Sequence, residues 1–318
     1  VVDEQDTDAV ARWDAGQGLM IRALVQVAKQ HQDNDTMVME STLIDAVEKI
    51  LKQPGDDLIV LVHLLALPTV AYLMQIDSTM DVLAWDAAHS FVKSTIADMF
   101  ESYFSEHYQQ LHTESPYEYS MENFAKRSFK NMCLSYLVAT EQPRYAEMAL
   151  QQFEKAGNMT DSWGALAALN QHDSALRNKA LDAFYKRWQD EPLVVNKWFG
   201  LHAQANFPDS LARVKQLMTH EAFSLNNPNN VYALICGFAA NTVGFHRGTD
   251  GESYAFIVDQ ALALDKINSL VAARVFKPLT RWRQLDPVRA ALMQQQLQRM
   301  AAIEGLSSDL YELVSKSL

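Results

Sequence analysis

The chain has 318 residues and a formal net charge of −12, with 27 Lys and Arg against 39 Asp and Glu. An acidic surface repels phosphate backbones and anionic lipid, so we expect neither a nucleic-acid partner nor a membrane partner. Glycine occurs 11 times and proline 9 times, which is well below the usual roughly 7 and 5 per cent. This scarcity of helix breakers favours an all-α protein.

Apolar residues recur at helical spacing along the whole chain. Five of them fall at positions i, i+3, i+4, i+7 and i+8 beginning at Met20, and the same pattern begins again at Tyr254. Such a stripe is typical of a helix with one buried face. Turn clusters such as "HQDND", "KQPGDD" and "KAGNMT" separate these segments about every 20 to 30 residues, which predicts helix pairs joined by short loops.

The longest apolar run is "LIVLVHLLAL" at residues 58–67. It is shorter than the roughly 18 to 20 residues that span a bilayer, so it predicts a buried element of a globular fold. Its β-branched start also fits a buried strand. We expect a helix because the neighbouring segments are helical.

Cys133 and Cys236 are the only cysteines, and each lies in an apolar helical pattern. Two isolated cysteines do not make a disulfide framework, so we expect buried thiols and a reducing, cytoplasmic location.

Helix starts can be placed in the second half of the chain. Asn227 before Pro228 predicts an N-cap followed by proline at the first helical position, and Asp286 before Pro287 repeats the arrangement. The segment "AANTVGFHRGTDGES" at residues 239–253 contains three glycines, so it predicts a loop.

A fragment of a zinc-peptidase motif occurs near the middle of the chain. His220 and Glu221 open an H-E-x-x-H pattern, but Ser224 stands in place of the second histidine. His107 and His112 are the closest histidine pair, and five residues turn a helix by about 140°, so they do not share a face. The sequence predicts no metal site and no catalytic constellation.

No strict repeat period and no Pro/Gly/Ser-rich linker divide the chain. We therefore expect a single domain over residues 1–318, built as an irregular HEAT-like superhelix of antiparallel helix pairs.

Seven segments resemble the last domain of the aminopeptidase N family of zinc peptidases, in its bacterial form. In chain order they are "RWDAGQ" (12–17), "AKRSFKNMCL" (125–134), "NMTDSWGALAAL" (158–169), "LVVNKWF" (193–199), "FSLNNPN" (223–229), "VAARVFKPL" (271–279) and "SSDLYELVSKSL" (307–318).

The resemblance implies a bowl-shaped C-terminal lid domain of a larger enzyme that releases N-terminal residues from peptides. In that family the zinc ligands and the catalytic residues lie in an upstream domain. The resemblance therefore implies no catalytic residue, no metal and no activity in this part alone, with zinc in the parent enzyme. It also implies two partners, the upstream catalytic domain and short peptide substrates, and a role in enclosing the active-site chamber.

Three residues carry the family's substrate-facing positions. The resemblance places Leu270 beside the pocket for the first side chain of the substrate, where relatives commonly have a polar residue. Tyr232 stands where relatives often have arginine, whereas Arg274 matches the family's residue. The alternative to this assignment is an independent helical-repeat scaffold that binds protein partners, and the reading frame upstream of Val1 would distinguish the two.

Overall fold

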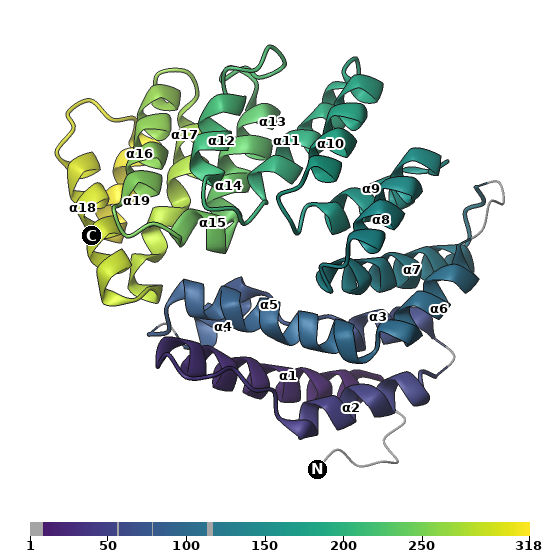
Figure 1. Cartoon of the computed structure of the whole chain (residues 1–318). Helices are drawn as coiled ribbons and strands as arrows, with labels where there is room; N and C mark the ends of the chain where they lie inside the picture. The colour runs from purple at the N-terminus through teal and green to yellow at the C-terminus, as the bar shows by residue number, and fades with distance from the viewer. Residues whose placement is uncertain (1–8, 56, 78, 113–116) are drawn as a thin grey trace. The chain divides into compact units, whose positions relative to one another are not determined.

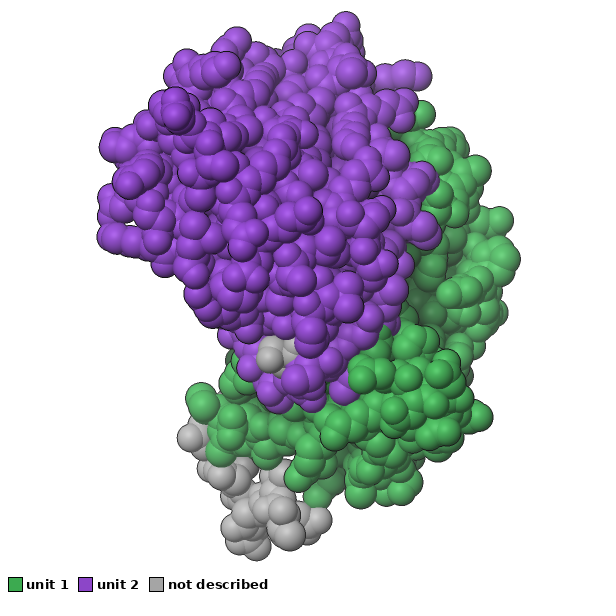
Figure 2. Space-filling model, turned by 90° about the vertical axis from the view of Figure 1, so that its left-hand side faces the viewer, with its two compact units in different colours: residues 1–73, 84–182 green, residues 74–83, 183–318 purple. Residues whose placement is uncertain are grey.

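The computed structural model describes residues 9–55, 57–77, 79–112 and 117–318, and every element in these ranges is helical (Figure 1). The predicted all-α class is therefore confirmed. The described residues form two compact units, one within residues 1–73 and 84–182 and the other within 74–83 and 183–318 (Figure 2). The predicted single domain over residues 1–318 and its predicted bowl shape stay predictions.

The first unit is built from the N-terminal helices. These are α1 (Ala9–Gln32), α2 (Ser41–Lys52), α3 (Leu58–Leu65), α4 (Val70–Ile76), α5 (Val82–Met99), α6 (Glu101–Leu111), α7 (Met121–Ala139), α8 (Pro143–Lys155), α9 (Met159–Leu169) and α10 (Ala175–Trp188). The unit boundaries fall within α4, α5 and α10. Helix α7 packs against α3, α6 and α9, so it forms the centre of this unit.

The second unit continues with shorter helices. These are α11 (Pro192–Ala203), α12 (Ser210–Leu217), α13 (Pro228–Val231), the π-helix η1 (Tyr232–Cys236), α14 (Gly237–Ala240), α15 (Thr242–His246), α16 (Glu252–Asp265), α17 (Ser269–Phe276), the 3₁₀-helix η2 (Lys277–Gln284), α18 (Pro287–Ala301) and α19 (Ser308–Ser317). Helix α17 packs against α16 and α19, and α11 packs against η1.

The buried faces agree with the predicted stripes. All five apolar residues of the stripe that begins at Met20 are buried in α1. In the stripe that begins at Tyr254 the first four are buried and Leu262 is half-buried. Burying a Val, Leu, Ile or Met side chain contributes about 1.5–3 kcal/mol, and alanine contributes less, so these stripes fix which face of each helix points inward.

The first eight residues of the apolar run at 58–67 form α3, as predicted, and the helix ends at Leu65. Asp57 caps this helix by accepting hydrogen bonds from the amides of Ile59 and Val60. No single helix in the described ranges is long and apolar enough to span a membrane; α3 with α4, bent by 57°, passes that test of length and composition only as a pair. Three leucines of α3 are buried within the protein.

The predicted caps are confirmed, whereas the predicted loop at residues 239–253 is only partly right. The side chain of Asn227 accepts from the amide of Asn229, and that of Asp286 accepts from Val288 and Arg289. Within 239–253, however, Thr242–His246 form α15. Its N-cap is Asn241, which also donates to two carbonyls at the end of α11 and just beyond it. These tertiary hydrogen bonds stabilise a helix that the glycine content obscures.

A buried arginine holds residues 74–83 to the rest of the second unit. Arg289 on α18 is 1% exposed, and its Nη1 lies 2.9 Å from Asp286 and 3.2 Å from Asp81. Its Nε donates to the carbonyl of His246. The same guanidinium therefore joins α18, α15 and a segment that precedes them by some two hundred residues in the chain.

Candidate functional site

Tyr232 begins the π-helix η1, which interrupts the helical run between α13 and α14. A π-turn is uncommon and often marks a functional position. The start of this run is fixed by Asn230, whose Oδ1 accepts from the amide of Ser224 and whose Nδ2 donates to Asn196 on α11 at 2.8 Å. This network gives Asn230 of "LNNPNN" a structural role, and it anchors the backbone just before Tyr232.

Arg274 lies on α17, a helix that starts at the N-cap Asn268. The guanidinium carbon of Arg274 is 4.1 Å from the centre of the Tyr232 ring. A guanidinium stacked on an aromatic face is held by the ring quadrupole while its N–H groups stay available at the edge. The structure therefore brings together two of the three predicted site residues.

Leu270 lies on the same helix, four residues before Arg274, so the two share one face. Leu270 is 71% exposed and Arg274 is also exposed, whereas Val271 and Val275 on the neighbouring face are buried. The three predicted residues thus combine an apolar side chain, a cation and an aromatic ring. Such a surface suits the side chains and the carbonyl or carboxylate groups of a peptide. Whether substrate reaches them stays a prediction.

The thiol of Cys236 lies at the end of η1, close to this pair. Burial raises its pKa to about 11, and the positive charge of Arg274 acts in the opposite direction. Cys236 is half-buried, not fully buried as expected, and its raised pKa disfavours the thiolate that a nucleophilic cysteine needs. Cys133, on α7, is fully buried, and burial raises its pKa far above the usual range.

His220 is half-buried and packs against aromatic side chains, so it has a structural role. Its ring lies 4.8 Å from that of Tyr185 and 5.2 Å from that of Trp198, and its Nδ1 accepts from the amide of Ala222. Glu221 accepts from the hydroxyl of Tyr185. In the described ranges no group of three or more His, Cys, Asp or Glu residues is placed to hold a metal ion.

One feature that the sequence did not indicate is a buried ion pair in the first unit. Lys130 on α7 and Asp161 on α9 are 3% and 9% exposed, and Nζ lies 2.9 Å from Oδ1. A cluster of basic residues in "AKRSFKNM" was visible, but nothing in the sequence showed which acidic residue it meets.

The chain is similar to known proteins over nearly its whole length. The profile of a family described as "Domain of unknown function (DUF3458_C) ARM repeats" matches residues 2–318. Aminopeptidase N of Escherichia coli (strain K12) is 30% identical over 313 residues, which cover 97% of this chain and 35% of that protein. Aminopeptidase N of Caulobacter vibrioides is 32% identical over 314 residues, covering 98% and 36%.

A solved structure agrees with these sequence matches. The crystal structure of Legionella pneumophila aminopeptidase A in complex with aspartic acid superposes with a TM-score of 0.88 at 27% identity, covering 98% of this chain and 37% of that one. The chain therefore spans little more than a third of the length of these relatives.

Proposed function

The chain belongs to the DUF3458_C family of ARM-repeat domains, and on that basis we propose that it is the C-terminal helical domain of a zinc aminopeptidase. In this proposal the parent enzyme removes N-terminal residues from peptides in the cytoplasm, and its zinc and catalytic residues lie in an upstream domain. The helical domain covers that active site and limits access to short peptides. Excluding bulk water in this way strengthens electrostatic contacts near a metal.

The observation that carries this proposal is the extent of the match. Relatives named as aminopeptidases are similar to this chain over 96% to 98% of its length, yet the chain accounts for only 35% to 37% of theirs. About two thirds of each relative is therefore available for the catalytic chemistry. The described part of this chain holds no group of residues placed to bind a metal ion, which agrees with a catalytic site in the rest of the parent enzyme.

The exposed face of α17 with η1 supports a role in contacting substrate. Arg274 is oriented by the ring of Tyr232 and is not committed to a carboxylate that the structure shows. Its N–H groups can donate to a peptide carbonyl or carboxylate, and Leu270 offers an apolar surface one turn away. In this proposal these residues form part of the wall that faces the bound peptide.

The test uses the upstream part of the same reading frame, expressed separately. Mixed with the 318-residue chain, the upstream part should form a complex, and peptide hydrolysis should become more selective for short substrates. The reference is the upstream part alone. If both parts are folded and do not associate at micromolar concentrations, or if the reading frame holds no zinc-peptidase motif, the proposal is wrong.

A further inference from the structure

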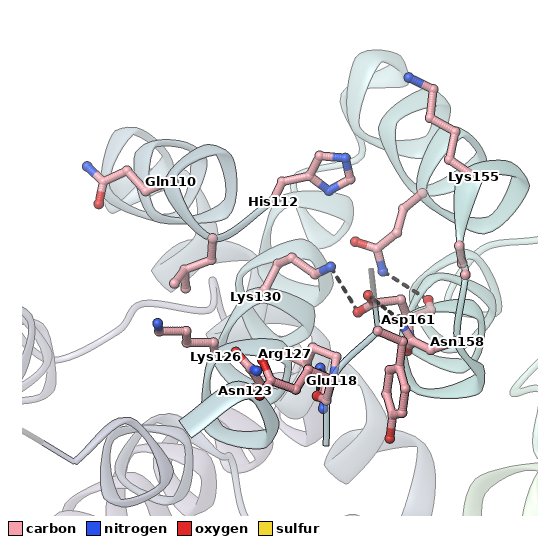
Figure 3. A pocket seen from close by; sticks show the side chains of 15 residues that line it. Gln110, His112, Glu118, Asn123, Lys126, Arg127, Lys130, Lys155, Asn158 and Asp161 are labelled. Atoms are coloured by element: carbon pink, nitrogen blue, oxygen red, sulfur yellow. Dashed lines mark hydrogen bonds and ion pairs between the residues drawn. The ribbon is translucent and has the colours of Figure 1, made fainter. Parts of the chain in front are cut away.

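A cavity of about 750 Å³ lies within the first unit. It is bounded by the end of α6, the first half of α7, the end of α8 and the start of α9, and Figure 3 shows the side chains that line it. Its volume falls in the range of roughly 300–1,000 Å³ that is usual for small-molecule sites. The cavity is therefore large enough for a ligand well beyond a single water molecule.

The lining of this cavity is basic, although the chain is acidic. Four cationic side chains and two carboxylates line it, namely Lys126, Arg127, Lys130, Lys155, Glu118 and Asp161. Lys126 also pairs with Glu122, which is not part of the lining, so the local excess is one positive charge. The whole chain carries a net charge of −12. A local excess of positive charge against that background favours an anionic ligand.

Lys130 supplies a buried ammonium to this space. In the described residues its Nζ has one partner, Oδ1 of Asp161 at 2.9 Å, and its side chain is 4% exposed. An ammonium has three N–H donors, and buried donors are almost always satisfied. The ion pair with Asp161 engages at most one of these donors, which leaves the others available to an acceptor within the cavity.

Arg127, one turn before Lys130 on α7, also has a hydrogen-bond donor without an acceptor among the described residues. Its guanidinium carbon lies 4.9 Å from the centre of the Tyr117 ring, and Nη1 donates to the carbonyl of Glu118 at 3.4 Å. These contacts hold the head group in place. Its Nε is buried and has no hydrogen-bond partner among the described residues. Residues three apart on a helix lie on one face, so Arg127 and Lys130 can bind one anion together.

Gln152 gives the cavity a neutral acceptor. This residue is 2% exposed, and its Nε2 donates to Asn131 at 2.8 Å and to the carbonyl of Asp161 at 3.0 Å. These two bonds fix the orientation of the amide. Its Oε1 is left without a partner in the described part of the chain, so it can accept a hydrogen bond from a hydroxyl or an N–H group.

We propose that this cavity binds a small molecule that carries an oxyanion, phosphate or carboxylate, together with a hydrogen-bond donor. Arg127 and Lys130 hold the oxyanion, and Oε1 of Gln152 accepts from the donor. A purely structural role would explain the pairing of Lys130 with Asp161. It would not explain why Arg127 and Gln152 leave buried polar atoms unsatisfied at the same cavity.

Calorimetric titration of the 318-residue chain at low ionic strength tests the proposal. Inorganic phosphate is one probe, and an acetylated dipeptide with a free C-terminal carboxylate is the other, with its C-terminal amide as reference. Two outcomes support the proposal. Binding of phosphate alone identifies the oxyanion as phosphate, and binding of the free acid in preference to the amide identifies it as a carboxylate. The proposal is overturned if the dipeptide acid and its amide bind equally well. It is also overturned if neither phosphate nor the dipeptide acid binds at millimolar concentrations.

Matched variants show whether the cavity is responsible. Arg127→Gln removes a charged donor and should weaken anion binding about tenfold or more. The control is Lys179→Gln, which makes the same change in charge outside the cavity, where Lys179 forms an exposed ion pair with Glu154. In this variant the affinity for the anion should stay within about twofold of the wild type. Equal losses in the two variants would show that only net charge matters, which would overturn the proposal.

Asn123→Asp provides a second variant that should keep the fold. Asn123 lines the cavity in the first turn of α7, where a negative charge stabilises the helix. The added carboxylate should weaken anion binding several-fold while the denaturation midpoint stays the same or rises. Unchanged affinity in this variant would contradict the proposed location.

Discussion

Replacing Arg289 by alanine should strongly destabilise the second unit. The substitution removes the guanidinium that pairs with the carboxylates of Asp286 and Asp81, which are 13% and 43% exposed. It also removes the donor to the carbonyl of His246. Breaking a buried ion pair costs about 3–5 kcal/mol. Since Asp81 is partly hydrated, its share is screened, and we expect a total near the lower end of that range.

Urea unfolding followed by far-UV circular dichroism measures this loss. The matched control is Arg299→Ala on the same helix, because Arg299 pairs with Asp259 where both side chains are about half exposed. An exposed pair contributes about 0–1 kcal/mol, so that variant should unfold close to the wild type. Equal losses of unfolding free energy in the two variants would refute the reasoning from burial.

Three further predictions concern substrate, pH and metal. In the parent enzyme proposed above, Arg274→Ala should lower kcat/KM for peptides, with a loss of transition-state binding of roughly 1–3 kcal/mol. Short anilides should lose little, and so should peptides in the control variant Lys277→Ala. A lowered melting temperature with unchanged peptide kinetics would instead indicate a structural role. Burial lowers the pKa of His89 and His246 from 6.5 to about 4, with a smaller effect from nearby cations. Below pH 6.5 the unfolded chain therefore binds more protons than the folded chain. The stabilisation that the two neutral imidazoles contribute should be fully present above pH 6.5 and be lost as the pH falls toward 4. His246→Gln should flatten this dependence, and an unchanged slope would contradict the assignment. Elemental analysis of the isolated chain should find no stoichiometric zinc, and one tightly bound zinc would refute that expectation.

The sequence by itself determined the helices and their buried faces. The stripe from Met20 and the caps at Asn227 and Asp286 depend on residues within one or two turns, and that is the range over which helical periodicity and capping operate. The resemblance carried by seven ordered segments also identified the family. The loop expected at residues 239–253 was partly wrong because tertiary hydrogen bonds from Asn241 stabilise α15.

Only the tertiary structure decided which side chains meet. It placed Arg274 on the ring of Tyr232, paired Lys130 with Asp161, and joined Arg289 to Asp81 across 208 residues of chain. A charged residue looks the same in sequence whether its partner is solvent, a neighbouring turn or a distant helix. Its partner, and hence its pKa, stability contribution and ligand-binding capacity, depends on burial and on the elements packed against it.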